Sequence, residues 1–380
     1  MAIHKVNFFP LGNADCCRID LDSGKQILID YAAMRDADDK GDLRIDLPAV
    51  LRKDLEARKR NYYEVVAFSH LDDDHIRGAS NFFYLEHAQK YQENMDGKVR
   101  IKIRELWVPA AVITEEGCTD EDRTIRQEAR YRLKRGSGIR VFSRPEALKA
   151  WLESEGLSIE ARHALITDAG QLVQGYRAET DGVEFFVHSP FACRTDDGTY
   201  VERNDGCLVL HATFMADGVK TRLFLGADIR QEPLSEIIRI TRSKHRLERL
   251  ESDIVKIPHH SSYLSLGPEQ GESKTKPTDE IAYFYEEQLM FRAKLISTSW
   301  VIPSDDSSCQ PPHRQAAKYY EDSAAAQGGE FVVTMERPTR QNPQPLVVEI
   351  TGSKSSIAKP FLGGATAAVT QRPPRAGHGF

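Results

Sequence analysis

The most constraining feature of this sequence is residues 68–78, where five potential metal ligands fall within the six residues from His70 to His75. Residues 63–68 form a short apolar run just before them, which predicts a buried β-strand. The ligand-rich residues therefore follow a strand, where α/β folds build their sites. Imidazole and carboxylate groups suit zinc, manganese or iron, and carboxylates can screen two cations from each other. The alternative is a solvated acidic turn with two incidental histidines, and the preceding strand argues against it.

Similar apolar runs, each ended by a polar or turn-forming residue, predict further buried strands. They cover residues 6–11, 26–29, 183–188, 207–212, 223–225 and 254–257. Asp228 and the pair His259-His260 follow two of these runs. Each could be structural, the aspartate as a turn former and the histidines as buried imidazoles. Because they join other Asp and His residues at strand ends, we expect His259 to bind metal and His260 to orient a ligand or contact the substrate.

The segment His70-x-Asp72-x-Asp74-His75 resembles the first motif of metallo-β-lactamase-fold hydrolases. It has the form found in the soluble nuclease-like domain of bacterial DNA-uptake (competence) channel proteins. Other segments match that domain in the same order along the chain, over about residues 3 to 350. These are residues 6–15 (opening strand and Gly-Gln-Gly-Asp turn), 27–30 (second strand), 204–210 (Asn-Asn-x-Ser-Leu-Val-Leu), 223–228 (a strand ending in Gly-Asp, with an alanine inserted) and 254–262 (Leu-Lys-x-Pro-His-His-Gly-Ser).

The resemblance implies an α/β fold of the metallo-β-lactamase type, a four-layer αββα sandwich with two divalent ions, Zn²⁺ or Mn²⁺. Its motifs assign the metal ligands to His70, Asp72, Asp74, His75, Asp205, Asp228 and His259. They assign substrate contacts to His260, Ser261 and Ser262. Asp74 would also orient the attacking water, and Asp228 would bridge the two ions. We expect Asp15 and Asp30 to anchor loops beneath the site rather than to bind metal.

Two departures from the family pattern affect these assignments. The family's Gly-His-Pro-His corresponds to Gln-Pro-Pro-His here, so only His313 remains to contact the phosphate or protonate the leaving oxygen. The third histidine motif is also absent, and its candidate replacements are Asp205, His188 and Asn204. We favour Asp205 because it comes directly before a predicted strand. An oxygen ligand at this place favours manganese over zinc.

The net charge of −6 and isoelectric point of 6.1 argue against a general nucleic-acid binder. Residues 123–144 nevertheless carry eight Lys and Arg side chains opposed by a single glutamate, and their helical spacing would let Arg130 and its neighbours follow a phosphate backbone. A solvated helix face, balanced by acidic residues at 115–122, is the alternative. The chain has no apolar run of about 20 residues and no secretory leader, so we expect a cytoplasmic protein without a membrane span.

We expect one hydrolase domain over residues 1–352, with a largely helical insertion at 81–175 and a mobile loop at 263–279 beside the site. Residues 353–380 are rich in Gly, Ala, Pro and Ser, which predicts a flexible C-terminal tail. The six cysteines form no Cys-x-x-Cys pair, so we expect reduced thiols.

Together these features predict a metal-dependent phosphodiester hydrolase, in the first place a nuclease acting on nucleic acid or a nucleotide. One alternative keeps the metals but takes a small molecule such as a cyclic nucleotide. Another is a metal-bound scaffold in a bacterial antiphage defence system, with the tail and basic helix docking protein partners. A nuclease should bind DNA with a clear salt dependence and a small-molecule enzyme should not, which separates the nuclease from the first alternative.

Overall fold

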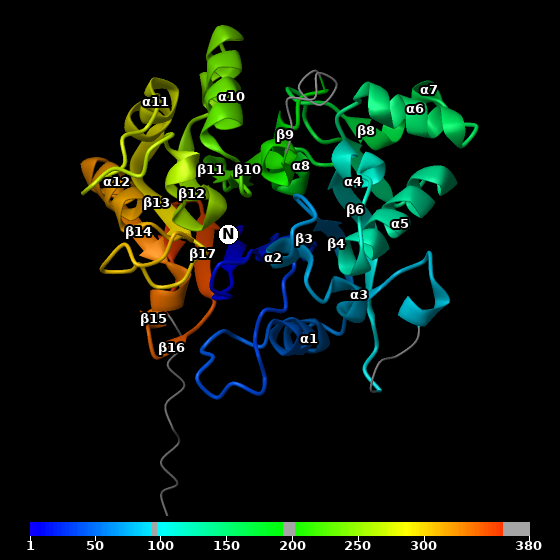
Figure 1. Ribbon diagram of the computed structural model, residues 1–380, viewed down its shortest axis with the longest axis horizontal. Helices are drawn as coiled ribbons and strands as arrows, with labels where there is room; N and C mark the ends of the chain where they lie inside the picture. The colour runs from blue at the N-terminus through cyan, green and yellow to red at the C-terminus, as the bar shows by residue number, and fades with distance from the viewer. Residues whose placement is uncertain (93–96, 193–201, 360–380) are drawn as a thin grey trace, which may run out of the picture.

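The computed structural model describes residues 1–92, 97–192 and 202–359, and its strands form two large sheets with helices to either side (Figure 1). The first sheet has the order β18-β17-β1-β2-β3-β4-β6-β7-β8, with β5 paired to β6. Strands β17, β1, β2 and β3 pair antiparallel, whereas β3, β4, β6, β7 and β8 pair parallel. Its strands are β1 (His4–Phe8), β2 (Cys17–Asp20), β3 (Gln26–Ile29), β4 (Tyr62–Ala67), β5 (Phe83–Tyr84), β6 (Ile101–Pro109), β7 (Ile139–Phe142), β8 (Ile166–Thr167), β17 (Leu346–Thr351) and β18 (Lys354–Ile357).

The second sheet has the order β14-β13-β12-β11-β10-β9. Strands β9, β10 and β11 pair antiparallel, and β11 to β14 pair parallel. A separate short ribbon joins β15 (Pro338–Thr339) to β16 (Asn342–Pro343). The strands of the second sheet are β9 (Val183–Ser189), β10 (Val209–Ala216), β11 (Val219–Leu225), β12 (Ser252–Lys256), β13 (Leu289–Ser297) and β14 (Glu330–Val333).

Helices cover the outer face of each sheet. The first sheet carries α1 (Leu47–Ala57), α4 (Ala110–Thr114), α5 (Asp120–Arg135) and α6 (Glu146–Ser154), and the second carries α10 (Gln231–Ser243), α11 (Asp279–Glu287) and α12 (Arg314–Ala326). Helix α1 illustrates how the sequence pattern produces these helices. Leu47, Leu51 and Leu55 recur every four residues and are buried on one face of the helix. Asp46 caps this helix by accepting a hydrogen bond from the Ala49 amide. The remaining short helices are α2 (Asp73–Ile76), α3 (Ala79–Phe82), α7 (Ile159–Arg162) and α8 (Ala178–Asp181).

Three apolar cores separate these layers. The middle core lies between the two sheets and includes Trp107, whose ring packs edge-on against Phe142, Tyr176 and Phe185 at centroid distances of 5.7, 5.6 and 5.4 Å. The two outer cores pack the helices against the sheets. Helix, sheet, sheet and helix therefore follow one another, which confirms the expected four-layer αββα sandwich.

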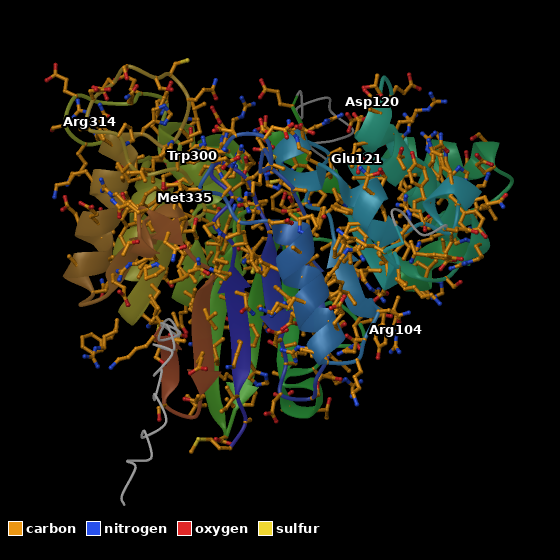
Figure 2. All side chains as sticks on the ribbon, turned by 90° about the horizontal axis from the view of Figure 1, so that it is seen from below. Arg104, Asp120, Glu121, Trp300, Arg314 and Met335 are labelled. Atoms are coloured by element: carbon orange, nitrogen blue, oxygen red, sulfur yellow. The ribbon has the colours of Figure 1, made fainter. Side chains whose placement is uncertain are left out.

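The parallel strands bring the functional loops to one edge. Strands β3 and β4 of the first sheet and β11, β12 and β13 of the second run parallel within their sheets, so within each sheet the loops after them leave from the same edge. Figure 2 shows Trp300, which follows β13, towards the same end of the molecule as Asp120 and Glu121, whereas Arg104 in β6 lies towards the other. This edge carries the residues discussed below.

The boundaries expected from sequence need two adjustments. Residues 81–175 are rich in helix as expected, but they also supply β5, β6, β7 and β8, so they extend the first sheet rather than stand apart from it. The predicted tail at 353–380 begins too early, because β18 pairs with β17. Residues 360–380 lie outside the described residues.

The loop at 263–279 opens with a 3₁₀ turn, Tyr263–Ser265, and packs on the start of α12, where the Thr275 amide donates to the Gln315 carbonyl. Its mobility stays a prediction. Each cysteine in the described ranges is a free thiol and only Cys309 among them is exposed, while Cys193 lies outside those ranges. No helix among the described residues is long and apolar enough to span a membrane.

Candidate metal centre

Two aspartates and two histidines form a cluster at the shared loop edge. Asp74 and His75 come from α2 after strand β4, Asp228 follows β11, and His260 follows β12. One ligand atom from each lies within 4.8 Å of all the others. The cluster thus joins both sheets of the sandwich.

The spacing of these atoms suits one metal ion. His260 Nε2 lies 3.2 Å from Asp74 Oδ2 and 3.4 Å from Asp228 Oδ2. His75 Nε2 lies 3.3 Å from Asp228 Oδ1. Ligands about 2.1 Å from a tetrahedral ion stand about 3.4 Å from one another. His75 Nε2 and Asp228 Oδ1 are buried and have no hydrogen-bond partner among the described residues, as expected of metal-binding atoms.

The far side of each imidazole is held by the protein. His75 Nδ1 lies 2.9 Å from Asp30 Oδ2, and His260 Nδ1 lies 2.7 Å from the Thr298 carbonyl oxygen. Asp30 also accepts hydrogen bonds from the Ser69 amide and hydroxyl at 2.7 and 2.8 Å. These contacts leave Nε2 of both rings facing the cluster, an arrangement typical of metal-bound histidine.

The backbone at the cluster is strained. His259, His260 and Ser261 have φ values of 48°, 52° and 64°, in the left-handed region that residues with a Cβ rarely adopt. Asp30 and Ala227 share this feature, with φ of 58° and 45°. Such residues cost on the order of 1–3 kcal/mol each and gather at functional sites. The strained backbone places both Asp30 and His260 where the cluster needs them.

A buried lysine, which sequence reasoning did not single out, sits beside the cluster. The Lys256 ammonium donates to Asp15 and to the Ala227 carbonyl, and lies 3.8 Å from Asp228 Oδ1. Burial works against its charge, but Asp15 and Asp228 raise the pKa of Lys256. The sequence signal was a lysine inside the otherwise apolar run at 254–257. Asp15 therefore pairs with Lys256, and Asp30 contacts His75. Ligand atoms of Asp15, Asp30 and His75 also lie within 4.8 Å of one another, so the expectation that the two aspartates only anchor loops stays a prediction.

The protonation of the metal-free cluster follows from its charges. Burial disfavours the charged imidazolium, but Asp228 and Asp74 raise the pKa of His260 to about 10. Asp30 and Asp228 raise the pKa of His75 against the same burial. In return, although burial favours the neutral acid, His260 and His75 lower the pKa of Asp74 to about 2. Without an ion, protons on the two imidazoles balance the carboxylates, and a bound cation would replace these protons.

His70 and Asp72 lie beside the cluster but do not complete a second one. His70 Nε2 is buried without a hydrogen-bond partner and lies 3.4 Å from Asp72 Oδ2, and its ring centroid is 4.0 Å from that of His75. The other oxygen, Asp72 Oδ1, is 3.2 Å from Arg203 Nη1. Within the described ranges, no third His, Cys, Asp or Glu joins this pair as a group able to hold an ion. The group of Asp74, His75, Asp228 and His260 is thus the one with four ligands, and His70 and Asp72 form part of a neighbouring position. Two three-residue groups also have ligand atoms within 4.8 Å of one another, Asp15 with Asp30 and His75, and Glu115 with Cys118 and Asp122.

The predicted third-motif ligand is elsewhere. Both carboxylate oxygens of Asp205 pair with Arg230, at 2.8 and 2.6 Å, so Asp205 does not join the cluster. His188 points its Nε2 at the Arg249 carbonyl, 2.9 Å away, and burial lowers its pKa to about 4. The buried Asn204 Oδ1 has no hydrogen-bond partner in the described part of the chain.

The two adjacent histidines are placed differently with respect to the cluster. His260 belongs to the cluster, whereas His259 Nε2 stands 4.0 Å from Asp228 Oδ2 and its side chain is 19% exposed. Both residues have left-handed backbone angles, and their rings stand 6.3 Å apart at an interplanar angle of 75°. The two side chains therefore do not occupy equivalent positions. His259 therefore faces the approach to the cluster.

The remaining predicted contacts are more remote. The ring nitrogens of His313 lie 3.4 Å from the Tyr263 amide and 3.3 Å from the Cys309 carbonyl, so this histidine anchors the loop instead of facing the cluster. Ser261 hydrogen-bonds to Ser297 at 2.7 Å, and the Ser262 hydroxyl accepts from the Leu264 amide. Both serines are buried, so neither is presented to a substrate.

The basic helix α5 is occupied by internal contacts. Arg130 donates to the Ile113 carbonyl at 2.8 Å and lies over the Trp151 ring, and Arg126 donates to the Glu115 carbonyl. Other charges on α5 pair with Glu86, Glu128 and Glu155. The prediction that Arg130 follows a phosphate backbone is not supported by this arrangement.

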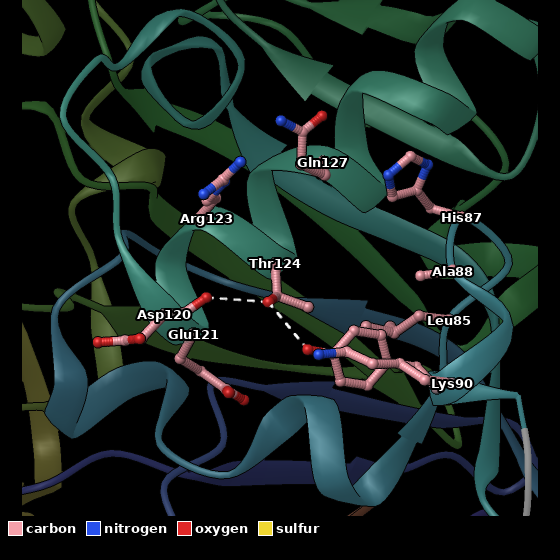
Figure 3. Close-up of a pocket in the computed structure, with 10 residues that line it drawn as sticks. Leu85, His87, Ala88, Lys90, Asp120, Glu121, Arg123, Thr124 and Gln127 are labelled. Atoms are coloured by element: carbon pink, nitrogen blue, oxygen red, sulfur yellow. Dashed lines mark hydrogen bonds between the residues drawn. The ribbon is translucent and has the colours of Figure 1, made fainter.

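A cavity of about 710 Å³ lies between residues 85–91 and the first turns of α5 (Figure 3). Thr124 links its walls, donating to the Asp120 carbonyl and lying 3.4 Å from the Tyr91 hydroxyl. Its lining mixes charges of both signs, including Lys90, Arg123 and Glu121. None of the four cluster residues lines it, so it is separate from the candidate metal centre.

No family model matches the sequence, and no curated protein matches it. Among solved structures, the chain resembles unliganded yeast PDE1 (10% identity, 88% of this chain and 97% of that chain, TM-score 0.42). It also resembles a diphosphatase from the PhnP family (9%, 82% and 92%, 0.33) and a long form RNase Z from yeast (12%, 81% and 39%, 0.31). At these scores the likeness says nothing about this chain's activity. The similarity to competence-channel domains stays a prediction.

Proposed function

We propose that this protein is a metal-dependent hydrolase of phosphodiesters. The observation that carries the proposal is the buried cluster of Asp74, His75, Asp228 and His260, whose ligand atoms stand at distances suited to one divalent ion. Two imidazoles and two carboxylates are a donor set for zinc or manganese. His75 Nε2 and Asp228 Oδ1 are buried without a hydrogen-bond partner among the described residues, and both imidazoles are held from behind. Such an arrangement is costly to keep unless an ion binds it.

A divalent ion in this cluster would supply a hydroxide near neutral pH by lowering the pKa of bound water to about 7. Asp74 is the most open of the four side chains, at 30% exposure, so the attacking water and the substrate meet there. His259 borders the same approach and can contact a phosphate oxygen. His70 and Asp72 would contribute to a second ion, as our sequence analysis expects, only with one further ligand.

The substrate that suits this site is a nucleotide or a nucleic-acid end. The internally paired arginines of α5 remove the expected track for a long polymer, and the net charge is −6. A small phosphodiester does not need a row of basic side chains along the protein surface to bind. A metal-bound scaffold would use the same ligand set, and the metal-dependent hydrolysis tested below separates it from an enzyme. Bacterial origin, a defence role and docking partners for the tail have no support from the described residues.

The test uses protein stripped of metal and reloaded with Mn²⁺ or Zn²⁺. Bis(p-nitrophenyl) phosphate, a cyclic nucleotide, single-stranded DNA and RNA are offered as substrates. We expect hydrolysis that depends on the metal and is abolished by Asp228→Asn. Asp205→Asn is the matched control, since Asp205 is equally buried but pairs with Arg230 outside the cluster. Hydrolysis of none of these substrates, or equal loss in both variants, would overturn the proposal.

A further inference from the structure

An exposed tryptophan lies close to the candidate metal centre. Trp300 is 38% exposed, whereas Trp107 is fully buried and Trp151 packs with Arg130 on the outer helices. Trp300 follows Thr298 by two residues, and the Thr298 carbonyl holds His260 Nδ1 at 2.7 Å. Two residues span at most about 7 Å. The indole is thus attached next to a cluster ligand, at the loop edge of the sandwich (Figure 2).

The chain fixes the position of this indole. Gly12 has φ of 74°, and a Cβ at this position would come within 2.6 Å of Trp300 Cε2, so only glycine lets the turn lie against the ring. Asn13 Oδ1 accepts a hydrogen bond from the Trp300 amide at 3.2 Å, and Asn13 Nδ2 donates to the Pro311 carbonyl. The same turn reaches the centre, because the Asp15 amide donates to the Asp74 carbonyl.

A guanidinium accompanies the indole. The Arg44 guanidinium carbon is 5.3 Å from the Trp300 ring centre, within cation–π range. The Arg44 guanidinium donates three hydrogen bonds to Asp42, at 2.9, 3.0 and 2.6 Å, so the planar group is oriented before any ligand arrives. An indole and a guanidinium are both groups on which proteins stack unpaired bases.

We propose that Trp300 and Arg44 form a platform on which a base of the substrate stacks while its phosphodiester lies at the metal cluster. This inference rests on the proposed function and narrows it to substrates that carry a nucleobase next to the scissile phosphate. Stacking on an aromatic side chain tolerates any base, because every base has a π face. The platform therefore selects nucleotides and single-stranded ends over phosphodiesters without a base.

The test measures binding as well as hydrolysis. Adenosine monophosphate and ribose 5-phosphate are titrated by calorimetry into the metal-loaded wild type, Trp300→Ala, Trp300→Phe and the control Trp151→Phe. We expect Trp300→Ala to weaken binding of the adenosine ligand roughly 5- to 150-fold and to leave ribose 5-phosphate unchanged. Trp300→Phe should keep most of the affinity, since it keeps an aromatic face. In Trp151→Phe, adenosine monophosphate should still quench the fluorescence of Trp300.

Unchanged adenosine monophosphate affinity in Trp300→Ala would overturn the platform. So would an equal loss for both ligands, because this would mean that Trp300 only supports the loop. If no phosphodiester is hydrolysed but the base-specific loss is found, the proposed function fails and the platform stands. Hydrolysis that is equally fast in wild type and Trp300→Ala, for a nucleotide and for an abasic phosphodiester alike, would leave the function standing and remove the platform.

Discussion

Replacing Asp30 by asparagine tests how the cluster is held from behind. Asp30 Oδ2 lies 2.9 Å from His75 Nδ1, and its other oxygen accepts the Ser69 amide. Asparagine is among the residues that best tolerate the φ of 58° at this position, so the backbone should keep its shape. The amide would, however, turn an N–H towards His75 Nδ1, where the carboxylate accepted a proton. The imidazole would then favour the tautomer that carries its hydrogen on Nε2, towards the ion.

The magnitude follows from this loss of orientation. Removing a partner that orients a metal-bound histidine lowers metal affinity roughly 10- to 100-fold, which corresponds to about 1.4 to 2.7 kcal/mol. The metal-free variant should also unfold more easily, by about 1–3 kcal/mol, because a buried donor loses its acceptor. The loss of metal affinity should be larger if the His75 ring cannot rotate away from the asparagine N–H. The His75 side chain is fully buried, which restricts such a rotation.

The assay is a Mn²⁺ or Zn²⁺ titration against a competing chelator, with unfolding in urea measured in parallel. Asp46→Asn is the control, since Asp46 caps α1 far from the cluster and asparagine caps equally well. We expect the control to match the wild type in both measurements. A folded Asp30→Asn protein whose metal affinity stays within twofold of wild type would refute the reasoning.

Three further predictions concern protonation, the metal loop and the core. The pKa of His260 is raised to about 10 and that of His75 is raised as well, so metal binding at pH 7 should release protons. Calorimetry would show this release as a binding heat that depends on the ionisation enthalpy of the buffer. These folded pKa values exceed the unfolded value of about 6.5, so the pairing stabilises the metal-free protein below that pH, and urea unfolding should show the stability falling as pH rises towards 10. Arg203→Ala removes the cation shared by three carboxylates and should lower the free energy of unfolding in urea by about 1–3 kcal/mol. The control Arg239→Ala removes an exposed ion pair and should lower it by only about 0–1 kcal/mol. Trp107→Ala leaves a cavity in the middle core and should lower the free energy of unfolding by about 3–5 kcal/mol, again measured in urea. A smaller loss would mean that the two sheets repack around the cavity.

Several strands and the metal loop could be predicted because both rest on local sequence. Short apolar runs ended by polar residues mark strands such as β4 and β11, and they also mark where His75 and Asp228 must emerge. The ordering of the strands into two sheets came from the resemblance rather than from periodicity. The extra strands β6 and β7 were missed because the charged helix between them dominates the composition of that segment.

The remaining assignments depend on contacts between distant residues. Nothing near Asp205 in the sequence indicates that Arg230 will take both of its oxygens. The α5 arginines likewise find acceptors such as Glu86, 49 residues away from Arg135. The choice between His259 and His260 turns on a left-handed backbone, which no spacing rule predicts for two consecutive histidines.

Metal analysis of two adjacent variants tests the central claim most directly. The four-residue cluster contains His260 and leaves out His259, although both follow the same strand. His260→Ala and His259→Ala are purified alongside the wild type, dialysed against trace metal, checked for folding and analysed by mass spectrometry. We predict about one tightly held ion per chain in the wild type and in His259→Ala, and a clear loss in His260→Ala. Retention of the ion in His260→Ala together with its loss from His259→Ala would contradict the account.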